Sequence, residues 1–184
     1  MFRCLSRWTV VITLALGTAA CGSGDDKTAA TPHTVTVFAA ASLTGTFTEL
    51  GKAFEAAHPG SRVTFNFGSS ATLAQQITQG APADLFAAAS LATMKTVTDA
   101  ALATAPVVFV HNKLEIAVPA ANPAKVESLK NLTDPKVKVA LCAVQVPCGA
   151  AAVKALDAAG LKVTPVTLEQ DVKATLTKVT LSEV

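Results

Sequence analysis

The chain has 184 residues and 51% of them are apolar, which is enough to bury a core and excludes a disordered chain. Two of its 15 basic residues lie in the first 20 positions, which leaves 13 basic against 13 acidic residues in the remainder. Residues 21–184 thus have no net charge and no basic stripe, which argues against nucleic acid as a partner. No run of 18 or more apolar residues follows the N-terminal stretch, so we expect no membrane-spanning helix in the body of the chain.

Residues 1–20 have the pattern of a secretory signal peptide. Arg3 and Arg7 supply its basic start, and Trp8 to Leu16 form an apolar stretch that is too short to span a bilayer. We therefore expect the first 20 residues to be an export signal and not part of the fold.

The end of this signal resembles the lipobox of bacterial lipoproteins. Small residues at positions 17–20 lead to Cys21, although Thr18 stands where that family usually has Leu. The resemblance implies that Cys21 becomes the lipid-modified first residue. The small, polar residues 21–33 then suit a flexible tether.

From residue 34 onward, segments with the hydrophobic spacing of strands alternate with segments that have the spacing of helices. Thr34 to Phe38 alternate as in a strand, whereas Leu43 and Phe47 begin an apolar stripe at helical spacing. Thr46 and Glu49 have the spacing of a capping box. The pattern predicts strands over residues 34–38, 62–67, 83–87, 106–110, 114–118, 137–141 and 162–166, and helices over residues 43–57, 69–79, 91–97, 149–159 and 171–179.

This alternation predicts an α/β fold with parallel or mixed sheets and helices on both faces. The extended stretch around residues 111–119 can carry the chain from one lobe to another. We therefore expect a first α/β lobe over residues 34–112 and a second over residues 113–184.

Three of the predicted strand-to-helix turns suit anion binding, at residues 38–42, 67–70 and 146–149. Ligands of open α/β sheets bind beyond the carboxyl ends of the strands, where helix N-termini offer unpaired N–H groups. Small side chains and the hydroxyls of Ser42 and Ser70 let an oxyanion approach without any Lys or Arg. Each serine taken alone is better explained as an N-cap, whereas the three turns together favour the anion site.

Cys142 and Cys148 remain after the signal and the lipidation site are set aside. An even pair in an exported chain indicates a short-loop disulfide, and two free buried thiols are the alternative. Their spacing excludes a CxxC redox motif, and a zinc site would need further His or Cys nearby.

Six segments between residues 34 and 184 together resemble periplasmic molybdate-binding proteins of ABC transporters. They are Val37-Phe-Ala-Ala-Ala-Ser-Leu-Thr44, Phe65-Asn-Phe-Gly-Ser-Ser70, Leu73-Ala-Gln-Gln-Ile77, Gln79-Gly-Ala-Pro-Ala-Asp-Leu-Phe86, Val146-Pro-Cys-Gly149 and Asp171-Val172. The resemblance implies a two-lobed, type II periplasmic-binding-protein architecture with mixed sheets. It also implies a monomeric protein that delivers molybdate or tungstate to an ABC permease and has neither enzymatic activity nor a cofactor. From this resemblance together with the signal peptide and the lipobox, we expect the protein to be exported and lipid-anchored to the membrane.

The same resemblance implies a ligand set of neutral donors, with no direct coordination of the metal. Ser42 and Ser70 would bind the molybdate oxyanion through hydroxyl and backbone N–H groups. Cys148, which replaces a familiar Ala, and Val172 would each donate a backbone N–H. A Cys142–Cys148 bridge would stiffen the binding turn.

The chain departs from the family mainly at its C-terminal end. The family has a Tyr ligand after the Asp-Val helix, whereas this chain contains no Tyr and ends at Val184. Ser90, outside the ligand positions, stands where the family usually has Asp. We therefore expect a C-terminally truncated, incomplete second lobe. A receptor for another tetrahedral oxyanion, such as sulfate, and a non-functional fragment are the alternatives.

A hydrolase is the rival from another functional class. It would combine Ser42 or Ser70 with His58 or His111 and with Asp84. Neither serine lies in a G-x-S-x-G turn. We expect His58 to be a solvated or C-capping residue and Asp84 to accept hydrogen bonds from backbone donors.

Overall fold

The computed structural model describes residues 33–184. The expected signal peptide, the lipidation site Cys21 and almost all of the expected tether lie outside these residues. In chain order the elements are β1 (His33–Ala40), α1 (Thr44–Ala57), β2 (Ser61–Gly68), α2 (Ser70–Thr78), β3 (Leu85–Ala87), α3 (Leu91–Asp99), β4 (Ala140–Cys142), α4 (Pro147–Ala158), β5 (Thr167–Glu169) and α5 (Val172–Thr180), with 3-10 helices at Ala41–Leu43 and Leu129–Thr133.

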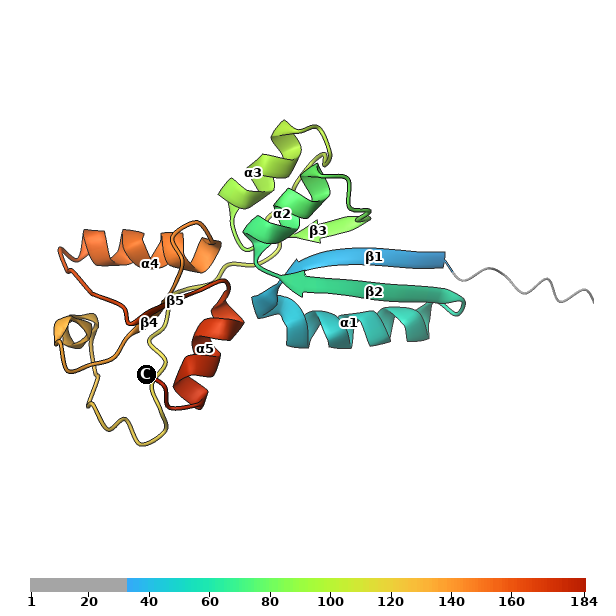
Figure 1. Ribbon diagram of the computed structural model, residues 1–184. Coiled ribbons are helices and arrows are strands. Elements are labelled where there is room, and N and C mark those ends of the chain that lie inside the picture. Colours follow the sequence, from blue (N-terminus) through green and yellow to red (C-terminus); the bar gives the residue numbers. More distant parts are fainter. Residues whose placement is uncertain (1–32) are drawn as a thin grey trace, which may run out of the picture. The chain divides into compact units, whose positions relative to one another are not determined.

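The first sheet has the strand order β2-β1-β3, and both of its strand pairs are parallel. Helix α1 covers one face, and α2 and α3 cover the other (Figure 1). The alternation of β1 explains this arrangement, because successive side chains of a strand point to opposite faces. Val37 packs with Phe47 of α1 and Phe65 of β2 on one side, and Phe38 packs on the other.

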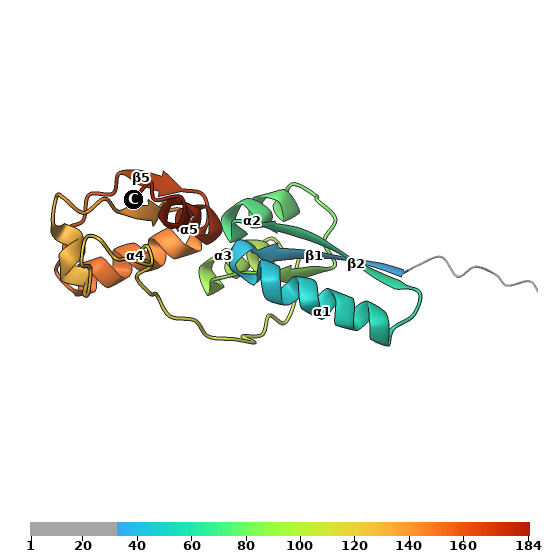
Figure 2. The ribbon, with the colours of Figure 1, turned by 90° about the horizontal axis from the view of Figure 1, so that it is seen from below.

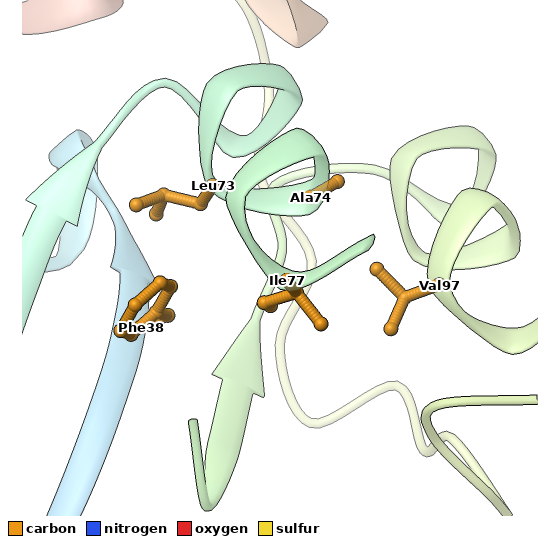
Figure 3. Packing of buried hydrophobic residues seen from close by; sticks show 5 residues of the cluster. All are labelled: Phe38, Leu73, Ala74, Ile77 and Val97. Carbon is orange, nitrogen blue, oxygen red and sulfur yellow. The ribbon is translucent and has the colours of Figure 1, made fainter. Parts of the chain in front are cut away.

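The core between the first sheet and its two shorter helices is small and tightly closed. Figure 3 shows Phe38 of β1 facing Leu73 and Ile77 of α2, with Val97 of α3 beyond them. Leu73 and Val97 are each 1% exposed. This core fixes the start of α2 relative to the end of β1, two places where the sequence predicts an anion site.

The second sheet consists of β4 and β5, which are also parallel. Helices α4 and α5 flank these strands (Figure 2). The Ala143 N–H extends the ladder by donating to the Glu169 carbonyl oxygen at 2.8 Å. Here again the carboxyl ends of parallel strands lead directly into helix N-termini.

The predictions of strands at residues 106–110 and 114–118 are wrong. The chain is irregular there, and among the described residues it forms no strand pairing. Val107 is 80% exposed, and the Phe109 ring contacts Phe47 with centroids 6.1 Å apart. An apolar, β-branched run becomes a strand only when a neighbouring strand supplies its hydrogen-bond partners.

Two further predictions need correction. The strand expected at residues 162–166 forms instead as β5, two residues beyond Pro165, which has no N–H for a ladder. The expected capping box fails because α1 begins at Thr44, so Thr46 and Glu49 lie inside the helix. Glu49 pairs there with Lys52 at 2.9 Å. No helix in the described part is long and apolar enough to cross a membrane.

Candidate functional site

A pocket of about 380 Å³ lies where strands of both sheets lead into helices. The four residues that the sequence singled out as donors, Ser42, Ser70, Cys148 and Val172, all line it. They belong to four different segments: the turn after β1 and the first turns of α2, α4 and α5. Ser42 and Ser70 follow the carboxyl ends of neighbouring strands in the first sheet, and Cys148 and Val172 follow those of the second sheet.

Most of the helix starts at this pocket have no side-chain cap. Ser69, the N-cap of α2, and Val146, the N-cap of α4, make no capping hydrogen bond. By contrast Ser90, the N-cap of α3, lies outside the pocket and accepts from the Thr93 N–H at 3.2 Å. Uncapped N–H groups carry the positive end of the helix dipole, so the pocket is suited to an anion.

Helix α5 has a side-chain cap, but this cap makes no hydrogen bond with the first N–H group of the helix. The Asp171 Oδ1 accepts from the N–H groups of Lys173 and Ala174, at 2.8 and 2.9 Å. The N–H of Val172, the first residue of the helix, is not among these donors. Asp171 therefore stabilises the helix start while Val172 keeps a donor for the pocket.

Ser70 is the most deeply buried of the four predicted donors, with 2% of its surface exposed. Its Oγ accepts from the Ala89 N–H at 3.0 Å, which ties α2 to the chain after β3. This contact uses a lone pair of the oxygen, so the hydroxyl proton is available for an acceptor in the pocket. Ser42, by contrast, is an exposed residue of the pocket lining.

A disulfide joins Cys142, the last residue of β4, to Cys148 in the first turn of α4, with 5.7 Å between their Cα atoms. The Cys142 sulfur lies 3.2 Å from the Thr175 hydroxyl of α5. The bridge therefore links a strand end to one helix start at the pocket and contacts the helix that provides another.

Replacing both cysteines by Ala (C142A/C148A) is expected to lower the free energy of unfolding by about 2 kcal/mol, because a short closed loop restricts the unfolded chain. Urea unfolding measured with and without reductant checks this. The wild-type midpoint should fall with reductant, whereas that of the double variant should not move. If the disulfide is reduced to two thiols and the urea midpoint of the wild-type protein does not change, the prediction is contradicted.

The polar and charged lining residues that were not singled out from the sequence include Ser69, Asn112, Lys113 and Glu115. Lys113 and Glu115 lie in the segment wrongly expected to contain strands, so no pattern signalled their place. Ser69 was not singled out because the sequence of two adjacent serines before a helix does not show which hydroxyl is hydrogen-bonded within the protein.

The residues of the rival hydrolase are not brought together. The Asp84 Oδ2 accepts from the Thr36 N–H at 2.7 Å, which confirms the expected structural role. His58 is the C-cap residue of α1, and its ring lies against Phe54 with centroids 4.4 Å apart. Neither residue, nor His111, lines the pocket. The described residues also contain no cluster of His, Cys, Asp and Glu that could hold a metal ion.

Comparison with known proteins agrees with this geometry. The sequence model of a family described as bacterial extracellular solute-binding protein matches residues 35–182. The molybdate-binding protein ModA of Mycobacterium tuberculosis is 41% identical over 181 residues, which cover 95% of this chain and 69% of that protein. A putative ABC transporter substrate-binding lipoprotein of Bacillus subtilis, YvgL, is 35% identical over 154 residues, 82% of this chain and 59% of the relative.

Among solved structures, the periplasmic molybdate-binding protein of Azotobacter vinelandii superposes with a TM-score of 0.61. The match covers 82% of this chain and 68% of that protein, at 18% identity. At that identity the likeness shows the fold alone. The expected type II binding-protein fold is thereby confirmed.

Proposed function

Because the chain belongs to the family of bacterial extracellular solute-binding proteins, we propose that it captures molybdate or tungstate outside the cytoplasm and delivers the anion to an ABC permease. The relatives that carry the name molybdate-binding protein support this choice of anion. No catalytic step is part of the proposed function.

One observation carries the proposal: the turn after β1 and the first turns of three helices line one pocket. The residues concerned are Ser42, Ser70, Cys148 and Val172. Each offers backbone N–H groups, and the two serines add hydroxyls. A hydrogen bond to a charged group contributes about 1.5–3 kcal/mol, so a ring of such donors can hold a dianion without a cationic ligand.

Selectivity would then come from cavity size and donor geometry. All four proposed ligands are neutral donors, so they recognise a full set of acceptor oxygens and penalise a protonated one. The expected lobes, residues 34–112 and 113–184, would close on the anion and present the closed surface to the permease. A receptor for sulfate would use the same donors and is the second candidate.

We further propose that Cys21 carries a lipid anchor and that the protein acts as a monomer at the membrane surface. The lipobox-like residues before Cys21 and the relative named as a substrate-binding lipoprotein support the anchor. Mass spectrometry of the protein extracted from membranes tests it, and a water-soluble chain with an unmodified Cys21 thiol would contradict it.

Isothermal titration calorimetry with molybdate, tungstate, sulfate and phosphate tests the proposed function. We expect molybdate and tungstate to bind at one site per chain, at least 100-fold more tightly than sulfate, which corresponds to about 2.7 kcal/mol. Preferential binding of sulfate would favour the second candidate. Absence of heat with all four anions would overturn the proposed function for this chain.

A further inference from the structure

We propose that Ser69, the residue before the expected ligand Ser70, is a further anion-binding residue whose hydroxyl donates to the bound oxyanion. This inference rests on the proposed function and deepens it, because it adds a donor to the same pocket. It concerns a side chain that neither the sequence pattern nor the resemblance singled out.

The observation is an unpartnered hydroxyl on a residue that lines the pocket. Ser69 lines the pocket and is 7% exposed. Its Oγ is buried and has no hydrogen-bond partner among the described residues. Ser69 is also the N-cap of α2, a nine-residue helix, yet its side chain does not cap it.

An N-cap serine usually accepts from the second or third N–H group of its helix, and a buried polar group without a partner costs stability. Ser90 at the start of α3 shows the usual arrangement: its Oγ accepts from the Thr93 N–H at 3.2 Å and lies 2.8 Å from the Thr93 hydroxyl. The same residue type at the same helix position is thus satisfied outside the pocket and unsatisfied at it.

The neighbouring serine explains why a second hydroxyl is useful there. The Ser70 Oγ is held by the Ala89 N–H at 3.0 Å, so its position is fixed by the protein. The Ser69 hydroxyl has no such tie, and rotation about a single side-chain bond moves it between staggered positions. An oxyanion at the uncapped start of α2 would give this O–H the acceptor that the protein does not provide.

Two matched alanine variants test the inference. In Ser69→Ala, we expect an unchanged or higher thermal midpoint, because an unsatisfied hydroxyl is removed, together with a loss of molybdate affinity of about tenfold. In Ser90→Ala, we expect the opposite: a lower midpoint from the lost cap and an affinity within twofold of wild type. Differential scanning calorimetry and isothermal titration calorimetry on the full chain provide the two readouts.

The outcomes separate this inference from the proposed function. A wild-type chain that binds no anion overturns both. A wild-type chain that binds molybdate, with an affinity unchanged in Ser69→Ala, overturns only the role of Ser69. A midpoint that falls in Ser69→Ala as far as in Ser90→Ala would show an ordinary helix cap and would likewise overturn it.

Discussion

Replacing Gly149 by Ala is expected to lower the free energy of unfolding by about 3 kcal/mol or more and to abolish anion binding. Gly149 is the third residue of α4, and a Cβ placed there would overlap the Ala143 carbonyl group and lie 2.6 Å from the Cys142 carbonyl oxygen. These are backbone atoms, which cannot swing away as a side chain can.

The obstructing carbonyl is also held in place from both sides. The Ala143 oxygen accepts from the Val146 N–H at 3.1 Å, and the Ala143 N–H donates to the Glu169 oxygen at 2.8 Å. Relief of the overlap would break one of these bonds or displace α4, whose first turn carries Cys148. We therefore expect stability and affinity to fall together.

Gly45→Ala is the matched control, since Gly45 also lies in a helix, α1, but nothing lies within 4 Å of its Cβ position. This change should raise the free energy of unfolding by about 0.5–1 kcal/mol, because Ala loses less backbone entropy than Gly in a helix. Urea denaturation compares the two variants. A Gly149→Ala protein as stable as wild type would show that the end of β4 and the start of α4 are less closely packed than described.

Replacing Ser70 by Ala is expected to weaken molybdate binding by roughly 10- to 100-fold, the effect of one lost hydrogen bond to a charged group. It should also lower the free energy of unfolding by about 1 kcal/mol, since the Ala89 N–H loses its acceptor. Calorimetric titration and urea denaturation measure the two effects separately.

Thr72→Ala serves as the control for Ser70, because Thr72 is an exposed residue of the same helix and does not line the pocket. Its affinity should stay within twofold of wild type and its stability within about 0.5 kcal/mol. If Ser70→Ala bound molybdate as tightly as Thr72→Ala does, Ser70 would be a structural residue and the expected ligand set would be wrong.

Much of this site could be predicted from the sequence because it depends on connectivity. The alternation of Thr34 to Phe38 predicts the strand β1, and the turn that follows this strand must place Ser42 at the carboxyl edge of the sheet. The same reasoning placed Ser70 after β2 and the turn with Cys148 after β4, whereas Val172 was expected only from the resemblance to molybdate-binding proteins.

What the sequence could not predict depends on partners that lie far away along the chain. Residues 106–118 carry the alternation of strands, but alternation reports side-chain character and not whether a neighbouring strand is present. For the same reason the sequence did not predict that Lys113 lines the pocket. Ser69 was missed because only the structure shows that its hydroxyl lacks the bond made by Ser90.

The most direct test of the central claim, that one anion binds where these helix starts converge, is a molybdate titration followed by amide NMR. We predict that the backbone N–H signals of Ser42, Ser70, Cys148 and Val172 shift together, with a single common midpoint, because all four face one anion. Shifts confined to residues of one sheet, or a saturating titration that leaves all four signals in place, would contradict the account.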